Sequence, residues 1–190
     1  MPVFLKKLKQ ELQKDKKLKG VYTPPNFVQR YVKDYPVIDP KTFDVVGAPG
    51  IKALQFTAIV PTDTNGPGSL PNYKVSCWFY NVDFYDNPEN NLSVPIDIET
   101  SKGWIVKYHR PPSFNKNQAK LKCQCADFRF RFEWELSEID GLIGGPRKYT
   151  RKTPPWPVGA PYANSSDKLG YCKHLHSLFQ YLKDTGQVTE

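Results

Sequence analysis

Cysteine and histidine gather in two short clusters of this 190-residue chain. Three of its four cysteines and two of its three histidines lie in Cys123-Gln-Cys125 and in Cys172-Lys-His174-Leu-His176. Thiolate sulfur and imidazole nitrogen are ligands that Zn²⁺ prefers, and four of them complete a tetrahedral shell with no open position. The two clusters therefore predict a structural zinc site that is made of three thiolates and one imidazole.

Either of two histidines could supply the imidazole of this site. If Cys172 lies within a helix, His176 shares its face at i+4 and His174 points away. If Cys172 precedes the helix, His174 can turn back toward the ion. A disulfide between Cys123 and Cys125 is disfavoured, because Cα atoms two residues apart on an extended strand lie near the upper limit for a bridge.

The segment that carries the first cluster has the pattern of a strand. Apolar and polar residues alternate almost without interruption from residue 122 to residue 136, which is the period of an extended chain. On this interpretation both cysteines lie on the polar side, together with Asp127 and Arg129. These two charged residues would orient a ligand or form an ordinary ion pair in solvent. The acidic residues 133, 135 and 138 are expected to be solvated.

A helix is predicted over about residues 173–184 and carries the second cluster. Its apolar residues recur at i, i+3, i+4 and i+7, and Gly186 follows as a cap. Upstream, residues 51–61 and 73–85 predict a hairpin, and residues 103–109 predict a third strand. Within the hairpin, Cys77 alternates with apolar residues, which predicts a buried thiol that takes no part in metal binding.

These elements predict an α+β fold with an antiparallel sheet core and amphipathic helices at both ends of the chain. The first 20 residues form a basic arm, with an amphipathic helix over about residues 2–18. Residues 21–118 form a β-rich domain, and residues 119–190 form a module that zinc holds together.

Residues 137–170 are rich in Gly, Pro and Ser and predict a long excursion from the core. A zinc ion at its base would offset the entropy of closing this loop. The proline content lowers the entropy lost when such an arm becomes ordered against a neighbouring subunit. The residues expected at that contact are Tyr149, Trp156, Pro157 and Tyr162.

The formal charge of +8 is concentrated at the amino terminus. Residues 1–20 contain seven lysines against Glu11 and Asp15, so they contribute +5 and the rest of the chain contributes +3. Nucleic acid is therefore a candidate partner for this lysine cluster rather than for the folded domain. No apolar run approaches the roughly 18 residues that span a bilayer, and no signal-peptide core is recognised. We expect no membrane partner and folding in the cytoplasm.

The pattern Cys123-x-Cys125…Cys172-x-His174 resembles the SWIM-type zinc motif. More specifically, the segments CQCADFRFRFEWEL, RKTPPWPVGAPYAN and GYCKHLHSLFQYLKDTG resemble a carboxy-terminal module of virion structural proteins from tailed bacteriophages, over residues 119–186. The resemblance implies that His174 is the fourth ligand. It also implies a non-enzymatic virion protein that contacts other virion structural proteins in multiple copies. The tail or baseplate is the first location, and the neck or head–tail connector is the next.

Enzymatic activity is not expected, because the sequence contains no recognisable nucleophile with its base, open metal position or pair of carboxylates in a pocket. The alternative is a SWIM-type zinc finger that binds nucleic acid. Against it, the arginines that follow the first cluster share their predicted face with several acidic residues, which weakens affinity for phosphate.

Overall fold

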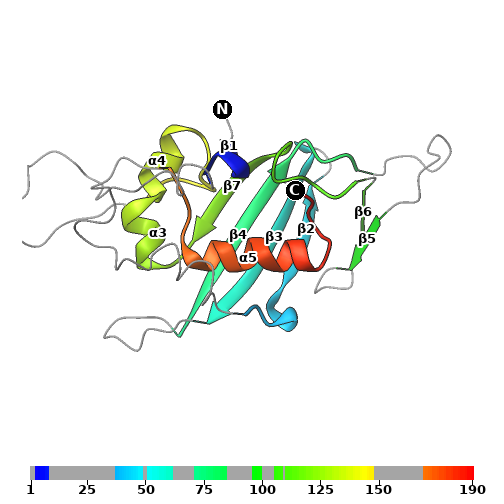
Figure 1. The fold of residues 1–190 in the computed structure, drawn as a ribbon, viewed down its shortest axis with the longest axis horizontal. Coiled ribbons are helices and arrows are strands. Elements are labelled where there is room, and N and C mark those ends of the chain that lie inside the picture. The colour runs from blue at the N-terminus through cyan, green and yellow to red at the C-terminus, as the bar shows by residue number, and fades with distance from the viewer. Residues whose placement is uncertain are drawn as a thin grey trace, which may run out of the picture.

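The computed structural model describes residues 3–8, 37–48, 51–61, 71–84, 96–99, 105–108, 110–147 and 169–190. A five-stranded antiparallel sheet has the strand order β1-β7-β4-β3-β2 (Figure 1). Its strands are β1 (Val3–Phe4), β2 (Asp44–Ala48), β3 (Ala53–Pro61), β4 (Asn72–Tyr80) and β7 (Gln118–Cys123). The strands β5 (Ile96–Glu99) and β6 (Ile105–Tyr108) pair separately, and the 3₁₀ turn η2 (Pro40–Thr42) precedes β2. The helices that the structure describes from end to end are α3 (Ala126–Arg131), α4 (Glu133–Glu138) and α5 (Lys173–Asp184), and residues 5–8 are also helical. This arrangement confirms the α+β class and the antiparallel sheet.

The predicted hairpin is confirmed, since β3 and β4 pair from Ala53↔Tyr80 to Pro61↔Asn72. Cys77 is fully buried on the core face of β4, as predicted. The second strand ends at Tyr80 rather than at residue 85, because Asn81 has a φ of 57° and turns the chain out of the extended conformation.

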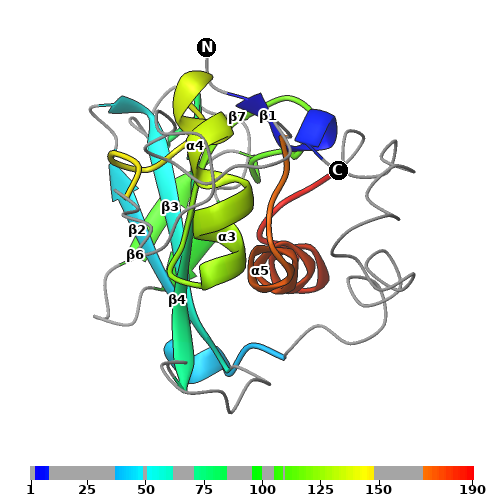
Figure 2. The ribbon, with the colours of Figure 1, turned by 90° about the vertical axis from the view of Figure 1, so that its left-hand side faces the viewer.

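The helix α5 lies across one face of the sheet and contacts β3, β4 and β7 (Figure 2). The predicted apolar stripe is buried: Leu175, Leu178 and Leu182 have no exposed surface, and Phe79 of β4 belongs to the same core. Gly186, with a φ of 69°, ends the helix as predicted. Its N–H donates to the Lys183 carbonyl, and the next N–H donates to Leu182.

The prediction of one strand as far as residue 136 is wrong. The strand β7 ends at Cys123, and two short helices follow it. Phe128, Phe132 and Leu136 recur at i, i+4 and i+8, and all three are buried in the core. Burying this helical stripe outweighs the local alternation of apolar and polar residues. Asp127 and Arg129 therefore do not share a face, since they are two residues apart on a helix.

The predicted amino-terminal helix is described only in part. Val3 and Phe4 form β1 against β7, so the helix begins at Leu5 rather than at residue 2. Leu5 and Leu8 are buried while the two lysines between them are exposed, which is the amphipathic pattern predicted for this stretch. The rest of that helix and most of its lysines lie outside the described residues.

The proposed boundaries at residues 20 and 118 stay predictions. The strand β7 begins at Gln118, so the second boundary falls within it, and β7 pairs with β4 from the preceding segment. Within the described part of the chain, no helix is long and apolar enough to cross a membrane.

Candidate metal centre

Four side chains with metal-binding atoms meet where β7, α3 and the start of α5 come together (Figure 1). Cys123 is the last residue of β7, Cys125 is the N-cap of α3, Cys172 is the N-cap of α5, and His174 lies in the first turn of α5. Their ligand atoms all lie within 4.8 Å of one another, and all four residues are buried. Because Zn–S distances of about 2.3 Å place tetrahedral ligands about 3.8 Å apart, this cluster fits one Zn²⁺ ion.

The choice between the two histidines follows from the position of Cys172. Its backbone is extended, with φ −81° and ψ 168°, so it precedes the helix rather than lying within it. His174 therefore turns back toward the three cysteines, as predicted for this case. His176 is half-buried and stacks on Tyr171, with ring centroids 6.3 Å apart and an interplanar angle of 4°.

Backbone amides point at the sulfur atoms of the first cluster. The Cys125 N–H donates to Cys123 Sγ at 3.4 Å, and the Phe128 N–H donates to Cys125 Sγ at 3.3 Å. The second of these bonds caps α3, so the turn that ends β7 and the start of the helix both depend on a cysteine sulfur. Amides at a helix N-terminus stabilise a thiolate, which is the form of cysteine that binds a metal.

The three thiols cannot all ionise in this buried cluster unless a cation is present. Burial raises the pKa of Cys123 and the pKa of Cys172, and the Cys125 side chain raises both further, while the hydrogen bond with Cys172 lowers the pKa of Cys123 in part. Hydrogen bonds from Cys123 and Cys172 lower the pKa of Cys125, and the His174 ring acts in the same direction. One thiolate is therefore favoured at Cys125, and a dication would stabilise the other two.

The imidazole of His174 fits a ligand role for an independent reason. Both of its ring nitrogens are buried, and neither has a hydrogen-bond partner among the described residues. The ring packs against Tyr73 at a centroid distance of 4.9 Å, which fixes its orientation without satisfying a nitrogen. Buried polar atoms are rarely left unpaired, so a bond from one nitrogen to a metal ion accounts for this arrangement.

A buried ion pair holds the backbone of the first cluster in place. The Arg147 guanidinium donates from Nη2 to the Cys123 carbonyl at 2.9 Å and from Nη1 to the Gln124 carbonyl at 3.1 Å. Its Nε lies 2.8 Å from Oε2 of Glu133, which is 1% exposed, and Lys122 Nζ lies 3.0 Å from the other oxygen. We name Arg147, Glu133 and Lys122 the outer clamp. The expectation that residue 133 is solvated is therefore wrong.

Two further segments fix the ligand turn on either side. Gln124 donates its N–H to the Lys74 carbonyl, and its side-chain oxygen accepts from the Lys74 N–H, so the turn is tied to β4. The chain after α4 returns alongside β7, where Leu142 forms a parallel bridge with Leu121. This path of the chain places Arg147 next to the cluster, although Arg147 lies 24 residues after Cys123 in the sequence.

The structure brings together Cys123, Cys125, Cys172 and His174, the four residues predicted as ligands. The residues predicted for a subunit contact, Tyr149, Trp156, Pro157 and Tyr162, lie outside the described residues, as does the whole of 148–168. Sequence reasoning missed the outer clamp. The helical spacing of Phe128, Phe132 and Leu136 could have placed residue 133 on a helix rather than on the solvent side of a strand, but it does not indicate the pairing of residue 133 with Arg147.

The geometry defines a closed cluster of three cysteines and one histidine that is compatible with a structural zinc site. No protein-family model, curated protein or solved structure matches this chain.

Replacing His174 with alanine is expected to weaken metal binding by more than about 100-fold, because it removes a ligand rather than an outer contact worth about 10–100-fold. His176→Ala is the matched control, since it removes the same ring two residues later and leaves the cluster intact. Titration with Co²⁺, followed by its visible absorption, measures both affinities. If the two variants lost affinity equally, the assignment of His174 would be wrong.

Proposed function

We propose that the cluster binds one structural Zn²⁺ and that the protein is a non-enzymatic structural component of a tailed-phage virion. The buried cluster of three cysteines and one histidine carries the first part of this proposal. The resemblance of residues 119–186 to a virion module supports the second part. The tail or baseplate is the favoured location, followed by the neck or head–tail connector.

A structural role suits the position of the site in the chain. The ion would join the end of β7 to the start of α5. In the sequence, 46 residues lie between the ligands Cys125 and Cys172. Closing a loop of this length costs conformational entropy, and zinc binding of about 10–16 kcal/mol, as seen in zinc-finger peptides, exceeds that cost. Four protein ligands would also fill the tetrahedral shell, so the ion would offer no position to a substrate.

The partners we propose are other virion structural proteins, present in several copies and assembled in the host cytoplasm. The contact would involve Tyr149, Trp156, Pro157 and Tyr162. The basic amino terminus is proposed to contact protein or nucleic acid in the assembled particle.

Two measurements test this proposal. Native mass spectrometry of the purified chain is expected to show one zinc ion per chain, and mass spectrometry of purified particles from the source of the sequence is expected to detect the protein. Absence of the protein from the particles would contradict the virion role while leaving the zinc site intact. A DNA affinity of the isolated chain that falls steeply with salt would favour the nucleic-acid-binding alternative instead.

A further inference from the structure

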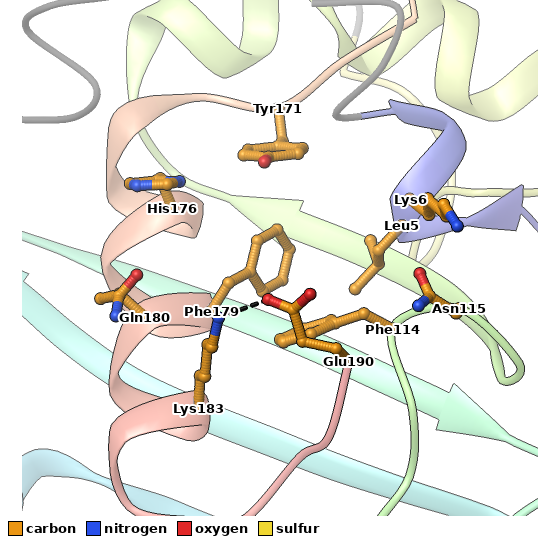
Figure 3. A pocket seen from close by; sticks show the side chains of 10 residues that line it. All are labelled: Leu5, Lys6, Phe114, Asn115, Tyr171, His176, Phe179, Gln180, Lys183 and Glu190. Atoms are coloured by element: carbon orange, nitrogen blue, oxygen red, sulfur yellow. Dashed lines mark hydrogen bonds and ion pairs between the residues drawn. The ribbon is translucent and has the colours of Figure 1, made fainter.

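A preformed pocket lies along one side of α5. Its volume is about 330 Å³. One wall is a stripe of α5 at i, i+3, i+4 and i+7, formed by His176, Phe179, Gln180 and Lys183 (Figure 3). The opposite wall comes from residues 5–6, residues 114–115 and the last residue of the chain. None of the four proposed zinc ligands lines this pocket.

The floor of the pocket is aromatic and held rigidly. Tyr171 and Phe179 meet edge to face at a centroid distance of 4.9 Å, and Phe114 packs on Phe179 at 5.7 Å. Tyr171 and Phe179 are 5% and 7% exposed, so packing within the core fixes both rings. Such a floor favours a large apolar side chain, because it supplies apolar area without having to reorganise.

Hydrogen bonds join the segments that form the second wall. The Lys6 N–H donates to the Phe114 carbonyl at 3.3 Å, and the Phe114 N–H donates to the Thr189 carbonyl at 2.9 Å. The Ser113 hydroxyl donates to the Glu190 carbonyl at 2.7 Å. The amino-terminal helical residues 5–8, the loop before β7 and the carboxy-terminal residues therefore form one connected wall, and the pocket exists before any ligand arrives.

The rim of the pocket is cationic and already holds one carboxylate. Lys6 and Lys183 are exposed at the mouth, and the Lys183 ammonium pairs with the Glu190 side chain (Figure 3). Glu190 is the single acidic residue of the lining, against two lysines.

We propose that this pocket binds an acidic peptide segment of a partner protein, which inserts one large apolar side chain and places a carboxylate against Lys183. The proposal deepens the proposed structural role, since it specifies the chemistry of a partner. The carboxylate of the partner replaces that of Glu190. Breaking the Lys183–Glu190 pair costs little free energy, because an ion pair between exposed side chains contributes little to stability. A volume near the lower end of the range for ligand pockets suits a single anchor residue rather than a whole helix.

The test uses the zinc-loaded full chain and the peptide acetyl-Gly-Asp-Phe-Glu-Gly-amide, with binding followed by amide chemical shifts. We expect a Kd below about 1 mM, with shifts at residues 5–6, 113–115 and 176–183. Lys183→Glu should weaken binding at least tenfold, and Glu190→Gln should strengthen it because it removes the competing carboxylate. Lys7→Glu is the matched control, since it makes the same change of charge at an exposed lysine that does not line the pocket.

Several outcomes would overturn this proposal. Equal weakening by Lys7→Glu and Lys183→Glu would show non-specific attraction, as would equal binding of a peptide with lysine in place of both acids. Unchanged affinity when alanine replaces the phenylalanine would exclude an apolar anchor. No shifts at millimolar peptide would exclude a peptide site, and 3-phenylpropionate binding as tightly as the peptide would show a small-molecule site instead. Since these measurements need no virus particle, their failure is distinguishable from failure of the virion role.

Discussion

Cys125→Ser is expected to abolish zinc binding and to lower the melting temperature by more than about 10 °C. Structural zinc contributes on the order of 10 kcal/mol in small domains, and about 1 kcal/mol corresponds to 2–4 °C for a chain of this size. Serine is the most informative replacement at this position. Cys125 is also the N-cap of α3, and serine is a good N-cap, so the cap is preserved while the ligand is lost.

Cys77→Ser is the matched control for this prediction. It makes the same chemical change at a fully buried cysteine outside the cluster, where burial raises the pKa and keeps the thiol neutral. We expect a cost of about 1–3 kcal/mol for burying an unpaired hydroxyl, and zinc should stay at one ion per chain. A chelator should then destabilise the wild type and Cys77→Ser but not Cys125→Ser. Equal, small losses in both variants, with no response to the chelator, would contradict a structural metal site.

The ligands could be predicted from the sequence because zinc selects a few side-chain types at short spacings. Two clusters on separate elements sufficed to indicate the site without knowledge of the fold. The choice between His174 and His176 could not be made from the residues alone. It depends on whether Cys172 lies before or inside the helix, and a difference of one residue at a helix start is below what a sequence pattern resolves.

The segment 122–136 shows why the local sequence pattern alone did not predict the correct secondary structure. Its residues satisfy two periods together: the alternation of a strand, and the i, i+4, i+8 spacing of Phe128, Phe132 and Leu136. The Cys125 sulfur accepts the Phe128 N–H and so caps the helix that begins just after β7. A capping sulfur is a weak signal beside fifteen alternating residues, so tertiary packing determined the outcome.

The outer clamp could not be predicted for a different reason. Arg147 and Glu133 are 14 residues apart and lie in stretches of mixed charge, where a solvated position is the usual one. Their contact exists only because α4 and the return of residues 141–143 along β7 place both side chains behind the ligand turn. Long-range pairing of this kind leaves no periodic signature in a single sequence.

Arg147→Met is expected to destabilise the protein by about 1–3 kcal/mol, because the buried Glu133 carboxylate loses the guanidinium and keeps only Lys122 Nζ and the backbone N–H of residue 147 as partners. It also removes the hydrogen bonds to the Cys123 and Gln124 carbonyls, so zinc affinity should fall about 10–100-fold as for other outer-shell substitutions. Lys120→Met is the control. It breaks an ion pair with Asp140, whose side chain is 56% exposed, and should cost at most about 1 kcal/mol.

The double variant Arg147→Met/Glu133→Leu separates the two roles of the clamp. Replacing both partners of a buried pair by apolar residues is often neutral, so urea unfolding should show most of the lost stability restored. Zinc affinity should stay low in the same variant, because methionine cannot donate to the two carbonyls that hold the ligand turn. Recovery of both quantities together would mean that Arg147 acts on the metal only through general stability. If the single variant Arg147→Met bound zinc with unchanged affinity, Arg147 would have no role in positioning the metal ligands.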